Sequence, residues 1–334
     1  MKTNTTPRIK PDLKIKNKPL SPSKPVKSDL VNHQFEQAEL TAVWGAYHAG
    51  RPLLLKGEPG TGKSQFAKAL AQHLGWAYVR ETMHGAMQLE DLHWHYDAVH
   101  HLGQAHAIGR GVSHAGDADS DIDSQLAYKN FIRPGAFAWA YDWEWAASQY
   151  SDDELNTIAP HTPDDWNHKK GPKSATQGVV LLIDELDKAE PDLPNGLLQT
   201  LGDFEFVIPQ LNQRIRANSE NLIVVITTNN ERDLPQALLR RCFCHTLTLP
   251  NSQDGMRKWL TERGKLHFGT AISDVAYEYA AEELYKERQD TTTYSPGLAE
   301  YLDLLRPLAK SKVPPEKQMP LLKEISQYTY QKGH

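Results

Sequence analysis

The feature that most restricts the fold is a glycine-rich stretch, GEPGTGKS at residues 57–64, which lies between two segments of different character. The preceding residues 52–55 form a short apolar run, which is typical of a buried strand. The following residues 66–74 carry apolar side chains at helical spacing. A strand, a glycine-rich turn and a helix in this order indicate an α/β fold.

The same stretch matches the phosphate-loop pattern of Gly, four residues, Gly, Lys and Ser or Thr. Its glycines let backbone N–H groups curl around a phosphate, and the helix beginning at Lys63 points its positive end at the same anion. We expect Lys63 to reach the β- and γ-phosphates and the Ser64 hydroxyl to bind Mg²⁺. The residues expected to bind the nucleotide here are Gly57, Glu58, Pro59, Gly60, Thr61, Gly62, Lys63 and Ser64.

Two further apolar runs, at residues 179–183 and 222–226, are typical of parallel strands buried on both faces. Asp184 and Glu185 follow the first run, at the sheet edge where ligands bind in such folds. Asp184 is expected to hold the Mg²⁺ water shell, and Glu185 to direct a water at the γ-phosphate. Asn229 follows the second run and can hydrogen-bond that water or the γ-phosphate.

Two adjacent arginines, Arg240 and Arg241, follow about a dozen residues after Asn229. Their forked guanidinium groups suit phosphate, and one supplied to a neighbouring subunit's nucleotide would stabilise charge in the transition state. The alternative is a basic helix end that complements the helix dipole.

Charge divides the chain into a basic N-terminal segment and an acidic remainder. Residues 1–30 carry eight Lys and Arg against Asp12 and Asp29, whereas the 334-residue chain has a net charge of -5. We expect this Pro- and Lys-rich segment to be a disordered, extended tail. The acidic remainder argues against a nucleic-acid-binding protein. No stretch approaches the about 18 apolar residues of a membrane span, and we expect a cytoplasmic protein.

The rest of the chain divides into two predicted domains. Residues 31–250 are expected to form the nucleotide-binding α/β domain, with a long insertion at about 98–178 that contains polar, turn-rich surface loops. Residues 251–334 show helical periodicity and no strand-like run, which predicts a small helical domain.

Five aromatic residues occupy alternate positions within the insertion. Core packing is one interpretation of them, and a surface that contacts a channel or a partner is the other. They are Phe137, Trp139, Tyr141, Trp143 and Trp145.

Four stretches in this order, GEPGTGKS, LLIDELDKA, TTNN and LPQALLRRC, resemble the AAA+ ATPases, and specifically their MoxR-like branch. The resemblance covers roughly residues 31–310. It implies a P-loop NTPase αβα sandwich with a parallel sheet and a small C-terminal helical lid. It also implies a ring, usually a hexamer, that hydrolyses ATP with Mg²⁺ to remodel or activate a protein partner, often one with a von Willebrand factor A domain.

The resemblance also assigns roles by position. Lys63 and Ser64 correspond to the Walker A pair, and Asp184 and Glu185 to the Walker B pair. Asn229 corresponds to sensor 1. Arg241 corresponds to the arginine finger, with Arg240 as a second candidate.

One family position departs from the pattern. Many AAA+ lids place an arginine, sensor 2, at the start of a lid helix, but this chain has Gly297 there. Arg306 follows nine residues later, about two and a half helical turns away. Direct coupling between the lid and the γ-phosphate of the same chain is therefore in question.

Two other functions remain open from the sequence. The first is a nucleotide-gated scaffold or regulator with little turnover, for example in a bacterial defence system. The second and weaker one is a nucleic-acid-stimulated motor that uses the basic tail. The intact Glu185 and Arg241 favour an ATP hydrolase.

Overall fold

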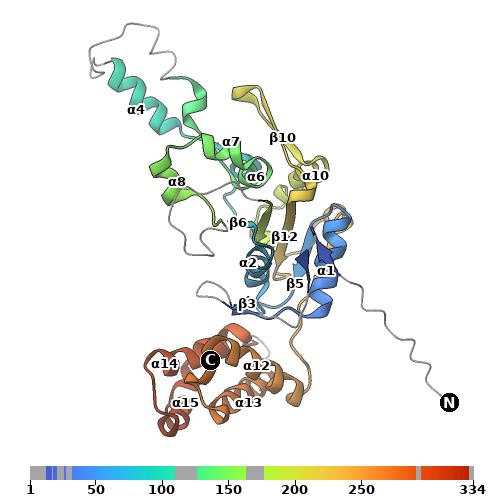
Figure 1. Cartoon of the computed structure of the whole chain (residues 1–334), viewed down its shortest axis with the longest axis vertical. Coiled ribbons are helices and arrows are strands. Elements are labelled where there is room, and N and C mark those ends of the chain that lie inside the picture. Colours follow the sequence, from blue (N-terminus) through green and yellow to red (C-terminus); the bar gives the residue numbers. More distant parts are fainter. Residues whose placement is uncertain are drawn as a thin grey trace, which may run out of the picture.

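The computed structural model describes residues 13–16, 18–20, 26–27, 32–109, 126–162, 177–290 and 295–330. Among these residues, five parallel strands form a central sheet in the order β13-β5-β12-β9-β6. An inserted region lies at one end of this sheet domain and the C-terminal helices lie at the other (Figure 1). The strands are β5 (Leu53–Lys56), β6 (Ala77–Thr82), β9 (Val179–Asp184), β12 (Leu222–Thr228) and β13 (Phe243–Thr246).

The strands are buried on both faces of the sheet, which explains their continuous apolar runs. In β9, Val180 and Leu182 pack toward α1 and α2, whereas Leu181 and Ile183 pack toward α6 and α10. The predicted fold class, a parallel sheet between helices with C-terminal helices, is confirmed. The covering helices are α1 (Gln37–His48), α2 (Lys63–Leu74), α6 (Ala136–Tyr141), α10 (Leu193–Asp203) and the short α11 (Gln236–Leu239).

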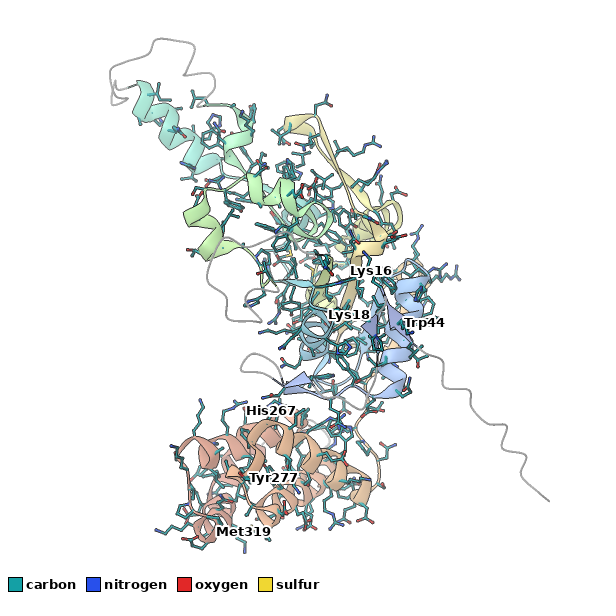
Figure 2. All side chains as sticks on the ribbon, viewed as in Figure 1. Lys16, Lys18, Trp44, His267, Tyr277 and Met319 are labelled. Atoms are coloured by element: carbon teal, nitrogen blue, oxygen red, sulfur yellow. The ribbon has the colours of Figure 1, made fainter. Side chains whose placement is uncertain are left out.

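The described residues 13–16 and 18–20 of the N-terminal segment pack on the α/β domain. Strands β1 (Lys14–Ile15) and β2 (Lys18–Pro19) form a small hairpin, and Leu13, Ile15 and Leu20 are buried in the core beside α1 and α2. Figure 2 shows Lys16 and Lys18 against this domain. The expectation of a disordered tail is wrong for these residues, because their three apolar side chains are removed from water by packing against the α/β domain. The remainder of residues 1–30, apart from β3 (Val26–Lys27), lies outside the described residues.

The insertion contains helices as well as loops. The expectation of a surface loop is wrong at α8, where Ser151 caps the helix through a hydrogen bond to Glu154 N–H. Residues 110–125 and 163–176, which include most of the other polar stretches, lie outside the described residues. Just before the insertion lie α3 (Leu89–His93) and β7 (Trp94–Tyr96), and within it lie α4 (Ala98–Gly109), β8 (Ile132–Pro134), α6, α7 (Trp143–Ser148) and α8 (Asp152–Ile158).

The alternate aromatic residues lie on the consecutive helices α6 and α7. Phe137, Trp139 and Tyr141 are buried, as the core-packing interpretation predicts. Trp143 and Trp145 are partly buried against the same core. Trp145 Nε1 donates to Gln213 Oε1 at 3.0 Å, which ties α7 to the hairpin of β10 (Glu205–Ile208) and β11 (Gln213–Arg216).

A buried histidine makes the stability of this region sensitive to pH. The His93 ring stacks on Phe206 with centroids 4.4 Å apart, and its Nε2 lies 2.8 Å from Thr200 Oγ1. Burial lowers the pKa of His93 to about 4. Because an unfolded histidine has a pKa of about 6.5, the unfolded chain binds the extra proton first as the pH falls.

We expect the native protein to lose about 2 kcal/mol of unfolding free energy at this site between about pH 7 and about pH 5. His93→Phe keeps a ring but cannot titrate, so the unfolding free energy of this variant should fall by about 2 kcal/mol less over the same pH range. Urea unfolding of both proteins at the two pH values measures the difference. Equal slopes with pH would show that His93 is not buried in neutral form.

The C-terminal helices form a separate bundle, called the lid below. Its core includes the buried Tyr277, Tyr301, Leu305 and Leu308. Figure 2 places His267 on the side of the lid that faces the α/β domain. Among the described residues, no helix of this or any other region has the length and apolar character needed to cross a bilayer. The lid helices are α12 (Gln253–Phe268), α13 (Asp274–Asp290), α14 (Leu298–Lys310) and α15 (Pro315–Tyr330).

Candidate functional site

The glycine-rich stretch forms a tight loop between the end of β5 and the start of α2, called the P-loop below. Gly57, Gly60 and Gly62 have φ angles of 152°, 74° and 96°, which side-chain-bearing residues rarely adopt. A Cβ on Gly57 would also lie only 2.6 Å from the backbone oxygen of Leu247. The predicted strand, turn and helix are confirmed, and the glycines are required by the backbone path.

Lys63 is buried at the first position of α2, inside the curve of the P-loop. Its Nζ donates to the carbonyl oxygens of Gly57 and Glu58 at 2.7 and 2.8 Å. Burial lowers the pKa of Lys63, and the nearby carboxylate of Asp184 opposes this shift. The ammonium group is thus held by neutral acceptors that phosphate oxygens could replace.

Asp184 lies at the carboxyl end of β9 and is buried. Its Oδ1 accepts hydrogen bonds from Ser64 Oγ at 2.9 Å and from Thr227 Oγ1 at 2.6 Å. Its Oδ2 accepts from Arg80 Nη2 at 2.7 Å. A hydroxyl and a carboxylate are oxygen ligands of the kind that Mg²⁺ prefers alongside substrate phosphates, so the predicted pair Ser64 and Asp184 fits this ion.

Glu185 is fixed at both its backbone and its carboxylate. It has a φ of 59°, a conformation that costs a non-glycine residue about 1 kcal/mol. Its N–H donates to Thr227 Oγ1 at 2.8 Å. Lys188 Nζ lies 2.8 Å from Glu185 Oε2, and Asn229 Nδ2 lies 3.5 Å from Oε1. The structure therefore brings together Glu185 and Asn229, as the sequence predicts for residues that share one water.

Asp187 holds the loop that carries Asn229. Its Oδ2 accepts the backbone N–H groups of Asn229 and Glu231, each at 3.0 Å. Between them, Asn230 adopts a φ of 59°. A buried carboxylate with two backbone donors thus fixes the turn after β12 and the direction of the Asn229 side chain.

A cavity of about 690 Å³ lies between the α/β domain and the lid. Its walls include Lys63, Ser64, Asp184, Glu185 and Asn229. This volume is within the range of about 300–1,000 Å³ for small-molecule sites. Six of the eight expected P-loop residues line it: Pro59, Gly60, Thr61, Gly62, Lys63 and Ser64.

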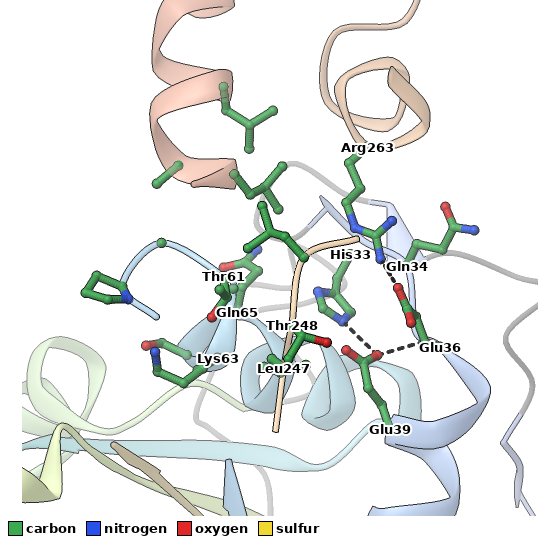
Figure 3. Close-up of a pocket in the computed structure, with 18 of the residues that line it drawn as sticks. His33, Gln34, Glu36, Glu39, Thr61, Lys63, Gln65, Leu247, Thr248 and Arg263 are labelled. Atoms are coloured by element: carbon green, nitrogen blue, oxygen red, sulfur yellow. Dashed lines mark hydrogen bonds and ion pairs between the residues drawn. The ribbon is translucent and has the colours of Figure 1, made fainter. Parts of the chain in front are cut away.

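The lid side of the cavity carries its own charged group. Arg263 of α12 reaches Glu36 with Nη2–Oε1 at 2.8 Å, as Figure 3 shows, and its guanidinium lies 3.5 Å from the centroid of the Trp259 ring. In the same view His33 Nε2 lies 3.9 Å from Glu39 Oε2. The Arg263–Glu36 ion pair joins the segment before α1 to the lid, whereas the His33–Glu39 contact lies within the α/β domain.

Arg240 and Arg241 lie between α11 and β13, and both are exposed. The Arg240 carbonyl accepts a hydrogen bond from Arg51 Nη1 at 3.3 Å. Neither arginine is among the described residues that line the cavity. Within one chain the structure does not bring them to the P-loop.

Gly297 is the N-cap of α14, and its N–H donates to Glu300 Oε2 at 2.9 Å. Arg306 lines the cavity from the lid side, beside its ion-pair partner Asp303. Gly297, where the chain differs from the family pattern, thus lies at the start of a lid helix, as expected.

Sequence reasoning missed four residues of this site: Arg80, Thr227, Asp187 and Lys188. Thr227 and Asp187 lie inside recognised motifs, TTNN and LLIDELDKA, and burial next to the two acids could have indicated them. Arg80 lies in β6, AYVRET, whose apolar half is too brief to stand out as a buried strand in the sequence.

Comparison with known proteins agrees with this fold. A family model described as AAA domain (dynein-related subfamily) matches residues 52–122 and 123–242, which is more than half of the chain. No curated protein gives a significant match. Among solved structures, a RuvB mutant from Thermotoga maritima shares 15% identity with a TM-score of 0.40, covering 86% of this chain and 67% of that chain. That likeness carries no argument about function. The family match is sufficient by itself: the chain belongs to the AAA domain family, in its dynein-related subfamily.

Proposed function

We propose that the chain binds ATP with Mg²⁺ and hydrolyses it. The observation that carries the proposal is that Lys63, Ser64, Asp184, Glu185 and Asn229 all line one cavity. Members of the AAA+ family generally hydrolyse ATP. A cavity that joins a phosphate-binding loop, a metal-binding pair and a carboxylate with an amide partner supports hydrolysis better than binding alone.

The chemistry follows from positioning and charge. The P-loop amides and Lys63 bind the β- and γ-phosphates. Bound Mg²⁺, held by Ser64 and through water by Asp184, would neutralise charge on these phosphates. The Glu185 carboxylate orients a water and accepts its proton, while Asn229 fixes the water or the γ-phosphate.

The assembly that we propose is a ring, usually a hexamer in the family, of the MoxR-like type in the cytoplasm. The exposed Arg241, or Arg240 beside it, would then act on the nucleotide of a neighbouring subunit. The work of the ring is to remodel or activate a protein partner, and a partner with a von Willebrand factor A domain is our candidate. Support for the MoxR-like branch comes from the quoted motifs. Support for action between subunits is that both arginines are exposed and are not among the described residues that line the cavity of their own chain.

The test is steady-state ATP turnover per subunit over a wide range of protein concentration. We expect activity to rise cooperatively with concentration, and Arg241→Ala to lower kcat at least about 100-fold while ATP still binds. Arg240→Ala decides between the two arginines. Arg257→Ala is the control, because that exposed lid arginine pairs with Asp254 at 3.1 Å within its own helix.

Two results would contradict this proposal. Activity independent of concentration and of both arginines would show that the site is complete in one chain. ATP binding without turnover at any concentration would instead favour the nucleotide-gated scaffold.

A further inference from the structure

The lid and the P-loop are joined by an ion pair between residues 230 positions apart. Arg288, in the last turn of α13, donates from Nη2 to Glu58 Oε2 at 2.7 Å. Its Nη1 donates to the Pro296 carbonyl at 2.8 Å, in the segment that enters α14. The Arg288 side chain is only 15% exposed, against 52% for Glu58. The arginine is thus anchored in the lid and presents a fixed guanidinium to the P-loop.

A backbone contact lies beside this ion pair. The N–H of Ala299, in the first turn of α14, donates to the Gly60 carbonyl at 3.2 Å. A Cβ placed on Gly297 would lie 3.2 Å from the Pro59 carbonyl oxygen. The start of α14 therefore packs on the turn of the P-loop so closely that a side chain at position 297 would crowd it.

Glu58 connects the lid to the phosphate-binding amine. Its carbonyl accepts hydrogen bonds from Lys63 Nζ and Thr61 Oγ1, each at 2.8 Å, while its carboxylate accepts from Arg288. Leu298 at the start of α14 lines the same cavity as Lys63. Glu58 therefore contacts both the phosphate-binding amine and the lid, beside the backbone contact between Ala299 and Gly60.

We propose that Arg288 is a positioning residue that holds the lid wall of the cavity against the P-loop through Glu58. This deepens the proposed function and rests on it. The family pattern places a lid arginine at position 297, where this chain has glycine. Here another lid arginine, Arg288, contacts the P-loop at Glu58, while Arg306 lines the cavity itself. Releasing the lid loosens one wall of the cavity, which weakens nucleotide binding without removing any phosphate contact.

The experiment is a double-mutant cycle in the full chain, read by the Kd of the fluorescent analogue mant-ATP. We expect Arg288→Met and Glu58→Gln each to raise Kd about 5-fold to 10-fold. The double variant should be no weaker than either single variant, because both remove the same interaction. Arg288→Lys keeps the charge but not the fork that reaches Glu58 and Pro296 together, so it should recover the affinity only in part.

A second readout follows the lid without nucleotide. Hydrogen exchange of the amides at residues 298–302 should become at least about threefold faster in both single variants. Arg257→Met is the matched control and should change neither Kd nor exchange, because its partners Asp254 and Glu282 both belong to the lid.

Additive effects on Kd, or unchanged exchange at residues 298–302, would overturn the proposal. If Arg288→Met fails to fold, Glu58→Gln alone decides through the same two measurements. Failure of the original chain to bind mant-ATP would instead count against the proposed function, and the exchange comparison would still decide whether Arg288 positions the lid.

Discussion

Replacing Lys63 by methionine is expected to raise the Kd for ATP at least about 100-fold. The ammonium group is the one cation that lies inside the curve of the described P-loop, within 2.8 Å of the Gly57 and Glu58 carbonyls. Charge-assisted hydrogen bonds to phosphate are about twice as strong as neutral ones, and methionine offers none. Equilibrium titration with mant-ATP measures the change.

Methionine preserves the straight, apolar stem of lysine, so α2 and its packing should remain intact. Lys68→Met is the matched control, because Lys68 lies on the same helix and faces a different cavity, beside Tyr78 and Arg80. We expect that variant to bind ATP within about twofold of the original. Unchanged ATP affinity in a folded Lys63→Met protein would mean that the P-loop is not the phosphate site.

The parts of the site that the sequence predicts are encoded within short stretches. The local structure at each of these places can be predicted from the residues there. This holds for the glycines at 57–64, for the apolar runs of β9 and β12, and for the polar residues that follow those runs. Parallel strands then bring those ends to one edge of the sheet, which is why Ser64 and Asp184 could be paired in advance.

The residues that could not be predicted depend on contacts between distant elements. Arg80 meets Asp184 only because β6 lies beside β9, and Arg288 meets Glu58 only because the lid docks on the P-loop. Neither pair has a local pattern. Such contacts are set by tertiary packing, which a periodicity argument does not contain.

The N-terminal segment shows that composition also does not predict which residues are buried. Its charge and prolines favour a disordered tail, yet Leu13 and Ile15 are buried against the α/β domain. The average composition of a segment does not reveal a few apolar residues that pack against a neighbouring domain. The burial of Leu13 and Ile15 could be recognised only once that surface was known.

Replacing Glu185 by glutamine is expected to stop hydrolysis while ATP binding persists. Glutamine has nearly the same shape, but its amide cannot accept the proton of the attacking water. We expect kcat to fall at least about 1,000-fold and the Kd for ATP to stay within about threefold. Single-turnover hydrolysis and mant-ATP binding measure the two quantities separately.

Glu185→Gln should leave the backbone contacts at this position unchanged. The Glu185 N–H still donates to Thr227 Oγ1, so the backbone at this position and the neighbouring Asp184 keep their arrangement. Glu190→Gln is the matched control, because Glu190 is an exposed acid a few residues further along the chain, and its kcat should equal that of the original. Hydrolysis by Glu185→Gln at the original rate would show that another group activates the water, and the role proposed for the Glu185 carboxylate would have to be abandoned.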